Sequence, residues 1–353
     1  MTSAFADAVL AWYDQHGRRL PWRGARDPYR IWIAEVMLQQ TQVETVKPYY
    51  RRWLRRFPTM RALAQAPLEA VLAQWEGLGY YTRARNLHRA ARQLVHERAG
   101  RLPASVDELR GLPGIGRYTA AAIASIAFNV AAAVLDGNVK RVLARVFNYT
   151  GDIKTPRGEQ DLWALAERLL PPDRPGDYNQ AVMDLGATVC TPRAPDCAAC
   201  PLGALCQARQ QGIQLALPAT TRRPRPPLHH LAVGVVRRRG RVLLVQRPPE
   251  ALLGGLWAFP AARLDDGASA RPRQRQTLRA DYGLQAQIGA PTQCVRHAYT
   301  HFRVVAQAYD CVWTDGRPRP SRAGERVKWV AITALADYPM GKVDRRIAQA
   351  LAA

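Results

Sequence analysis

The chain has 353 residues, of which 48% are hydrophobic and 22% charged, a balance that is typical of a globular protein and excludes extensive disorder. Its 51 lysines and arginines outnumber 28 acidic residues and give a net charge of +23 at pH 7, which favours a polyanionic partner and above all nucleic acid. No apolar run reaches the roughly 20 residues of a membrane span, and the first residues carry acids, unlike a signal peptide. We therefore expect a cytoplasmic protein with no membrane partner.

Residues 1–188 show apolar side chains at spacings of three and four, which predicts a succession of helices with no strand between them. The helix predicted over residues 29–38 is apolar on nearly every side and contains Glu35. A lone carboxyl in such a helix is costly to bury unless it is paired or protonated. Glu35 is therefore a candidate catalytic acid rather than an ordinary surface residue.

The stretch from Leu112 to Val142 combines features that no other part of the sequence shares. It opens on a Gly–Pro hairpin, continues into an Ala-rich helix predicted over residues 118–127 and ends near Asp136. The glycines permit a tight turn whose N–H groups point outward at a helix N-terminus, where a DNA phosphate could bind, although a plain connection between helices is the alternative. The candidate phosphate contacts are Leu112, Pro113, Gly114, Ile115 and Gly116.

Asp136 precedes Gly137 and Asn138 and is predicted to cap a helix over residues 139–147. Together with Glu35 it also supplies two carboxyl groups. Cleavage of a glycosidic bond requires such a pair, one protonated and one ionised.

Four of the six cysteines form a cluster with the spacing C-x6-C-x2-C-x5-C. They are too close together for a disulfide framework in a chain of this length, so we expect a reducing compartment and a metal site. A single C-x2-C pair flanked by outlying cysteines favours an iron–sulfur cluster, with zinc as the alternative. The expected ligands are Cys190, Cys197, Cys200 and Cys206, whereas Cys294 and Cys311 are expected in strands or the core.

A segment rich in proline and arginine over residues 213–229 predicts a linker. The pattern beyond it changes, and we expect a multidomain protein with an all-α domain over residues 1–212, including the cysteine loop 190–206, and an α+β domain over residues 230–353. Alternating residues predict strands at 231–236, 241–247, 304–313 and 326–332, with helices around 274–282 and 343–351.

The hairpin followed by Asp136 resembles the helix-hairpin-helix, Gly-Pro-Asp superfamily of base-excision DNA glycosylases, and the cysteine spacing is that of its endonuclease III branch. Within that branch the chain is similar to the adenine DNA glycosylases, over essentially its whole length. The segments that carry this resemblance are residues 32–43, 77–84, 112–116 and 135–141, together with the four cysteines. The resemblance implies a [4Fe-4S] cluster on those cysteines.

The resemblance further implies a monomeric, monofunctional enzyme that releases adenine paired with 8-oxoguanine or guanine in double-stranded DNA of the bacterial nucleoid. Endonuclease III carries a lysine at the position of Tyr118 and forms a Schiff base, which tyrosine cannot do. In the implied mechanism the adenine is flipped out, neutral Glu35 protonates its N7, and Asp136 stabilises the oxocarbenium-like sugar or forms a transient adduct with it. Tyr118 and Asn138 would position Asp136 and the sugar.

DNA contacts are implied by the resemblance as well, and Tyr80 would act as a wedge in the duplex. The C-terminal domain resembles the Nudix fold, but the region 276–284 has Asp281 where a metal-binding box needs several glutamates, so we expect a reader of 8-oxoguanine rather than a hydrolase. The implied duplex contacts are Arg23, Gln40, Thr41, Leu78, Tyr80 and Arg83, and the implied lesion contacts are Tyr299, Thr300 and His301, of which the first two depart from the usual Phe and Ser.

Three other functions compete with this interpretation. A thymine glycosylase of the same branch, acting on G·T mismatches, can also carry tyrosine at position 118. A non-catalytic DNA-binding protein would need neither Glu35 nor Asp136. A hydrolase of oxidised nucleotides is disfavoured by the missing glutamates.

Overall fold

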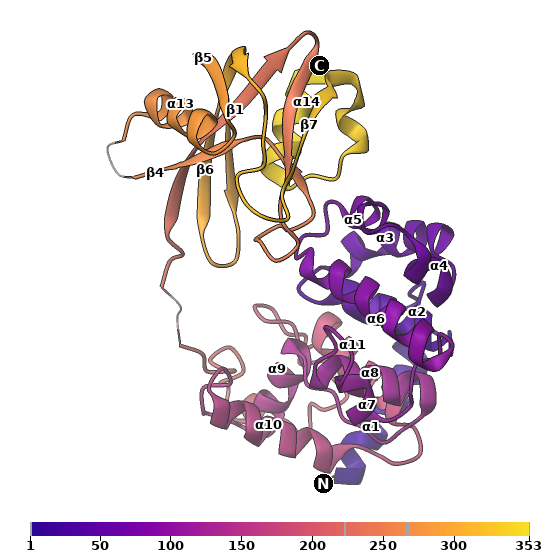
Figure 1. Ribbon diagram of the computed structural model, residues 1–353. Helices are drawn as coiled ribbons and strands as arrows, with labels where there is room; N and C mark the ends of the chain where they lie inside the picture. Colours follow the sequence, from indigo (N-terminus) through magenta and orange to yellow (C-terminus); the bar gives the residue numbers. More distant parts are fainter. Residues whose placement is uncertain (1, 222–223, 266–267, 353) are drawn as a thin grey trace. The chain divides into compact units, whose positions relative to one another are not determined.

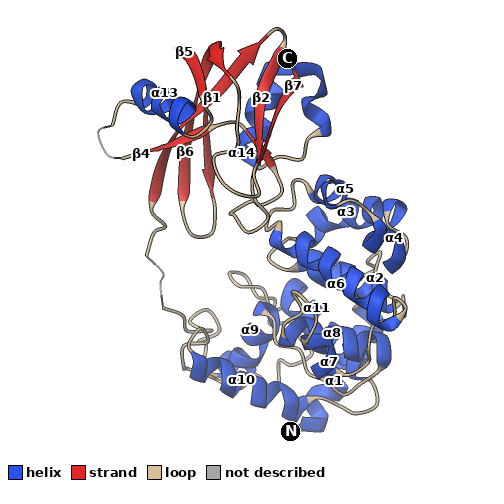
Figure 2. Ribbon diagram, viewed as in Figure 1, coloured by secondary structure: helices blue, strands red, loops and turns tan. Residues whose placement is uncertain are grey.

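The computed structural model describes residues 2–221, 224–265 and 268–352 and divides into two compact units. The helical unit comprises the chain up to Gln65 together with Arg89–Arg223. The sheet unit comprises Ala66–His88 together with Pro224–Ala353. Strands occur in the C-terminal part of the chain only, as far as the structure describes it (Figure 2).

The helical unit confirms the expected succession of helices. Its elements are α1 (Thr2–His16), α2 (Pro28–Leu38), α3 (Val43–Arg56), α4 (Met60–Gln65), α7 (Val106–Arg110), α8 (Arg117–Phe128), α9 (Gly137–Val146), α10 (Pro156–Leu169), α11 (Pro175–Thr188) and α12 (Gln207–Gln210). One core lies among α1 and α8 to α11 and includes Leu143, Leu162 and Leu185, all fully buried. Helix α2 packs against α8, which brings the Glu35 helix to the helix that follows the hairpin.

Two further helices belong wholly or partly to the sheet unit: α5 (Leu68–Trp75), and α6 (Thr82–Arg98), which crosses from one unit to the other. Residues 66–88 therefore group with the C-terminal chain, although the sequence analysis places them in the helical domain. The predicted domain boundaries remain a prediction.

The sheet unit is built around one mixed sheet with the strand order β3-β2-β1-β6-β5. β4 also pairs with β1, and β7 pairs with β2. β1 runs parallel to β6, with Val233 beside Ala308, and the other pairings are antiparallel. The elements are β1 (Leu228–Arg238), β2 (Arg241–Gln246), β3 (Trp257–Ala258), β4 (Ala261–Leu264), α13 (Ala270–Ala280), β5 (Leu284–Ala298), β6 (Arg303–Gly316), β7 (Arg326–Ala331), a 3-10 helix (Ile332–Asp337) and α14 (Lys342–Ala352).

Helices α13 and α14 cover opposite faces of this sheet (Figure 1). The alternation of β2 explains how one strand serves both faces, since Val242 and Leu244 pack on the α14 side whereas Leu243 and Val245 pack on the α13 side. The predicted helix around 274–282 begins earlier, at Ala270, and β1 begins inside the predicted linker.

Strand β5 is not among the strands expected from the sequence. Residues Leu284–Ile288 alternate between buried and exposed, but the alternation is interrupted over residues 289–292, where the register against β6 shifts around Pro291. A strand that is interrupted in this way gives only a short signal with a period of two.

Candidate active site

Glu35 lies in the middle of α2, a helix whose start is defined by local chemistry. Asp27 caps it by accepting a hydrogen bond from the Tyr29 N–H at 2.9 Å, and Pro28 occupies the first helical position. From Ile31 to Met37 every residue of the helix is buried, and Glu35 is only 5% exposed. The acid inferred from the sequence pattern is therefore a buried carboxyl.

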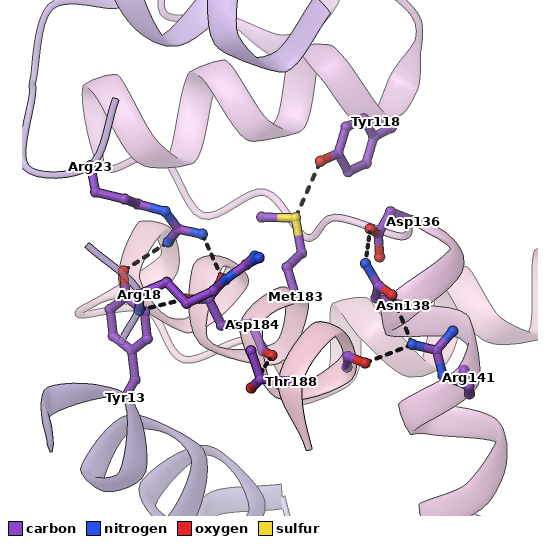
Figure 3. A network of polar contacts seen from close by, with 11 residues as sticks. Tyr13, Arg18, Arg23, Tyr118, Asp136, Asn138, Arg141, Met183, Asp184 and Thr188 are labelled. Atoms are coloured by element: carbon purple, nitrogen blue, oxygen red, sulfur yellow. Dashed lines mark hydrogen bonds and ion pairs between the residues drawn. The ribbon is translucent and has the colours of Figure 1, made fainter. Parts of the chain in front are cut away.

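Tyr118, in the first turn of α8, donates its hydroxyl hydrogen to Glu35 Oε2 at 2.8 Å. The same hydroxyl lies 3.2 Å from the sulfur of Met183 on α11 (Figure 3). Burial raises the pKa of Glu35, against the opposing effects of the Tyr118 hydrogen bond and the Arg23 charge, and the nearby Asp136 raises it further. These surroundings thus shift the protonation equilibrium of Glu35 toward its neutral, proton-bearing form.

Asp136 caps α9 as the sequence predicts. Its Oδ1 accepts a hydrogen bond from the Val139 N–H at 2.7 Å, and its Oδ2 accepts one from Asn138 Nδ2 at 3.1 Å. Burial leaves the pKa of Asp136 raised overall, although these hydrogen bonds and the Arg141 charge partly offset the effect. The start of α9 also favours a negative charge at this position, so the ionised form has specific support that Glu35 lacks.

Asn138 is itself held by Arg141 (Figure 3). The Arg141 guanidinium donates to Asn138 Oδ1 at 2.8 Å, to the Gly186 carbonyl at 2.7 Å and to the Cys190 carbonyl at 2.8 Å. A continuous chain of hydrogen bonds therefore joins the carboxylate of Asp136 to the backbone of the first clustered cysteine.

Arg23 is fixed by the buried carboxylate of Asp184 and by Tyr13, at 2.9 Å and 2.8 Å (Figure 3). Asp184 is fully buried and also accepts two side-chain hydrogen bonds and one backbone hydrogen bond from Arg18. Through its charge Arg23 also lowers the pKa of Glu35. Arg23 thus belongs to the electrostatic surroundings of the candidate acid.

The hairpin between α7 and α8 has the geometry expected of an outward-facing backbone turn. Gly114 adopts a φ of +78°, and the Ile115 N–H donates to the Leu112 carbonyl at 3.2 Å. Leu112 and Ile115 are buried, whereas Gly114 and Gly116 are exposed, with open space where a Cβ of Gly116 would lie. The backbone of the glycines, rather than the apolar side chains, is available to a phosphate.

The four clustered cysteines line one small cavity beside α9, together with Arg145. Arg145 is 2% exposed and donates to Cys190 Sγ at 3.3 Å and to the carbonyls of Thr191, Pro192 and Leu217. Among the described residues, no group of three or more His, Cys, Asp or Glu side chains is arranged to hold a single metal ion. Burial raises the pKa of Cys200 to about 11.

Gln40 and Thr41 follow the Glu35 helix. Gln40 is exposed with a φ of +56°, and the neighbouring Gln39 donates to Thr119 Oγ1 at 3.0 Å. This places the segment against the first turn of α8. Gln40 and Thr41 thus lie in the same helical unit as Glu35 and Tyr118.

In the sheet unit, the loop between α5 and α6 exposes Tyr80, 45% accessible with a φ of +48°, and buries Leu78. Arg83 is buried against it, with its guanidinium near the rings of Trp75 and Tyr80 and bonded to the carbonyls of Leu78 and Gly79. Burial lowers the pKa of Arg83 to about 10, which leaves it charged at neutral pH. The charged guanidinium of Arg83 thus packs against the loop and supports it.

Tyr299, Thr300 and His301 form the turn between β5 and β6, closed by a hydrogen bond from the Tyr299 N–H to the Phe302 carbonyl at 2.8 Å. The Tyr299 ring packs between His297 and Phe302, whereas Thr300 and His301 are exposed. The Tyr80 hydroxyl and Thr300 Oγ1 lie 2.6 Å apart. Two residues that the resemblance assigns to different tasks are therefore hydrogen-bonded to each other.

Known proteins resemble both halves of the chain. Residues 33–168 match the family described as HhH-GPD superfamily base excision DNA repair protein, and residues 232–350 match the NUDIX domain family. The chain is 40% identical over 385 residues to the adenine DNA glycosylase of Rattus norvegicus, covering 93% of this chain and 74% of that protein. The chain belongs to the adenine DNA glycosylase family. The Homo sapiens member is also 40% identical, over 87% of this chain and 66% of that protein.

Solved structures of related glycosylases match the N-terminal part of this family member. A thermostable thymine-DNA glycosylase is 31% identical with a TM-score of 0.55, covering 60% of this chain and 97% of that one. A non-covalent endonuclease III–DNA complex shares the fold at 23% identity and a TM-score of 0.51, covering 61% of this chain and 99% of that one. The predicted glycosylase fold followed by a Nudix-like domain is confirmed. No helix within the described residues is long and apolar enough to cross a membrane.

Three residues of this site are not singled out by the sequence analysis: Arg141, Met183 and Asp184. Asp184 could have been found by the criterion that identifies Glu35, because it is an acid within an otherwise apolar helical stretch, Ala181–Leu185. Met183 and Arg141 carry no such signal. A methionine in a helix and an arginine after a helix start are common. Met183 contacts Tyr118, 65 residues away, and Arg141 reaches the Cys190 carbonyl, 49 residues away, so neither contact is visible in the local sequence.

Proposed function

We propose that this protein is a monofunctional adenine DNA glycosylase of base excision repair that hydrolyses the N-glycosidic bond of adenine opposite 8-oxoguanine or guanine in duplex DNA. The observation that carries this proposal is the presence in one unit of a buried Glu35, whose pKa is raised by burial, and of the helix-capping carboxyl of Asp136. Acid-assisted glycosidic cleavage requires one protonated and one ionised carboxyl, and in this pair it is Asp136 that accepts a backbone hydrogen bond at a helix start.

In this mechanism the flipped adenine receives a proton at N7 from neutral Glu35, so that the base leaves without negative charge. Asp136 faces the sugar as a carboxylate and stabilises the positive charge that develops there. Asn138 orients Asp136, and the hydroxyl of Tyr118 orients Glu35. Because a tyrosine stands where a lysine would form an imine, water completes the reaction and strand cleavage is not expected.

Four thiols lining one cavity, with Arg145 donating to a cysteine sulfur, fit a cluster of negative thiolates. Cys190, Cys197, Cys200 and Cys206 would hold a [4Fe-4S] cluster, and the cluster would supply a rigid, redox-capable anchor for the loop. Broad visible absorbance with iron and without zinc is the expected result, and stoichiometric zinc would contradict it.

DNA is proposed to contact the exposed hairpin glycines, Gln40, Thr41, and the wedge Tyr80, with the turn 299–301 reading the base opposite adenine. Support comes from the exposure of Gly114, Gly116, Tyr80 and Thr300. Action as a monomer on the chromosome of a bacterium stays a prediction.

One gel assay tests the proposed activity. Duplexes containing A opposite 8-oxoguanine, A opposite G, or T opposite G are incubated with the protein and analysed with and without alkali. We expect alkali-dependent cleavage at A in the first two duplexes. Cleavage at T would favour the thymine glycosylase, to which the similarity of the thymine-DNA glycosylase structure points. Breakage without alkali would indicate a lyase, and no cleavage would overturn the proposal.

A further inference from the structure

Two carboxylates anchor the segment Ala66–His88 to the rest of the sheet unit, and the first is more exposed than the second. The first is Glu69 on α5. Its Oε1 accepts hydrogen bonds from Gln246 at 2.9 Å, from the Trp257 indole at 3.0 Å and from Arg326 at 2.9 Å. A single oxygen thus ties α5 to β2, β3 and β7, although the Glu69–Arg326 pair itself is largely exposed.

The second anchor is Glu76, at the C-terminal end of α5. It forms a two-point ion pair with Arg345 of α14, with distances of 2.5 Å and 3.1 Å, and it accepts the Met340 N–H at 3.1 Å. Arg345 donates in addition to the carbonyls of Leu335 and Tyr338 at 2.8 Å and 2.6 Å. Both charged side chains are about four-fifths covered, so this pair is screened far less than a surface pair.

Glu76 and Tyr81 flank the loop that carries Tyr80, and both bind the same residue. The Tyr81 hydroxyl donates to the Met340 carbonyl at 3.1 Å, while Glu76 accepts the N–H of Met340. Met340 is fully buried. The two ends of the loop are therefore fastened to the backbone of one core residue in the C-terminal chain.

The loop between these fastenings needs such support. Gly77, Gly79 and Tyr80 all have positive φ values, of 100°, 72° and 48°, and this conformation is costly for a tyrosine. At its tip, Tyr80 is hydrogen-bonded to Thr300 in the turn between β5 and β6. Loop and turn are thus connected directly at the tip. At the base, the Glu76–Arg345 pair joins the loop to α14, whose Val343 and Ile347 belong to the core cluster against which Tyr299 of the turn packs.

We propose that Glu76 and Arg345 are positioning residues for lesion specificity, coupling the turn that reads the base opposite adenine to the loop that carries the wedge. This inference rests on the proposed function, which assigns the reading of the opposite base to the turn and the wedge to the loop. The pair holds the base of the loop against α14 and so helps to set the distance between the loop and the turn. A difference between 8-oxoguanine and guanine, sensed at the turn, then changes the fit of the wedge.

The test uses Arg345→Met in the full chain, with adenine release measured in single turnover at subsaturating enzyme. The readout is the ratio of the rate on A opposite 8-oxoguanine to the rate on A opposite G. We expect this ratio to fall about tenfold, within the usual range of coupling between sites, with the loss confined to the 8-oxoguanine duplex. Arg275→Met removes the same charge from an exposed position on α13 and should leave the ratio unchanged.

Two further variants separate positioning from simple loss of structure. Arg345→Lys keeps the charge but not the two-point geometry, so it should recover part of the ratio. In the background of Arg345→Met, Thr300→Ala should lower the ratio by less than it does in the wild-type protein, because both changes weaken the same coupling between the loop and the turn.

A ratio within about twofold of wild type, or an equal loss on both duplexes, overturns the inference, since neither is a change in discrimination. If Arg345→Met does not unfold cooperatively, its fold is not intact. The same ratio is then measured with Glu76→Gln, which keeps an acceptor for the Met340 N–H. A wild-type protein that releases no adenine refutes the proposed function itself. Adenine release with unchanged discrimination in the variants refutes only the coupling.

Discussion

At the scale of single residues, the chemistry depends on two acids in contrasting surroundings. Glu35 is enclosed by an apolar helix and receives one hydrogen bond from Tyr118, which does not offset the loss of hydration. Asp136 begins a helix and receives hydrogen bonds from a backbone N–H and from Asn138. Burial raises the pKa of both acids, and Asp136 differs from Glu35 in the backbone N–H and the helix start that favour its ionised form.

Replacing the buried acid tests its assigned task. Glu35→Gln should slow adenine release by about 10²- to 10⁴-fold, the usual contribution of a general acid, because an amide has no proton to transfer to N7. Binding to the duplex should persist. The measurement is single-turnover release at saturating enzyme, with the exposed Glu97→Gln as the control. A near-wild-type rate in Glu35→Gln would remove Glu35 from the mechanism.

The pKa directions predict the pH profile of release. Glu35 must be protonated, and because its pKa is raised, the rate should fall on the alkaline side only above the ordinary glutamate range. Asp136 must be ionised, so the rate should rise with pH through its pKa. Asn138 lowers that pKa, and Asn138→Ala should therefore move the acid limb to higher pH while leaving the alkaline limb in place. An unmoved acid limb would contradict the role of Asn138.

At the scale of elements, the contact between α9 and α11 determines how Asp136 is supported. Gly186 of α11 lies against Asn138, and a Cβ built on it would come 2.7 Å from the Asn138 Cβ. This close approach allows the Gly186 carbonyl to accept from Arg141, which in turn holds Asn138. A small residue at a helix crossing thus positions a side chain of the active site.

Gly186→Ala should destabilise the fold by about 1–3 kcal/mol, the usual cost of overpacking, and should slow adenine release by displacing Asn138. The matched control is Gly137→Ala, where a Cβ meets nothing within 4 Å and unfolding should be no easier than in the wild type. Thermal unfolding measures the first effect and single-turnover release the second. Equal unfolding temperatures for the two variants would show that the crossing tolerates a methyl group.

At the scale of the whole molecule, the net charge of +23 is the property most directly tied to DNA. Phosphate contacts release counterions, so affinity for the duplex should fall steeply with salt, by about 10³- to 10⁵-fold between 50 and 200 mM if 6–10 phosphates are contacted. Binding titrations with an uncleavable duplex measure this slope. The rate of release at saturating enzyme should change little, and a flat affinity would argue against phosphate contacts by the hairpin.

Local patterns in the sequence are sufficient to predict the helical half, most of the strands, the acid in an apolar helix, the cap at Asp136 and the clustered cysteines. These follow from hydrophobic period, turn chemistry and spacing, which are local along the chain. The folded chain was needed to show that Tyr118 donates to Glu35, 83 residues away, and that Tyr80 is hydrogen-bonded to Thr300, 220 residues away. Such contacts depend on how helices and sheet pack, and that packing is a property of the folded chain that no local pattern contains.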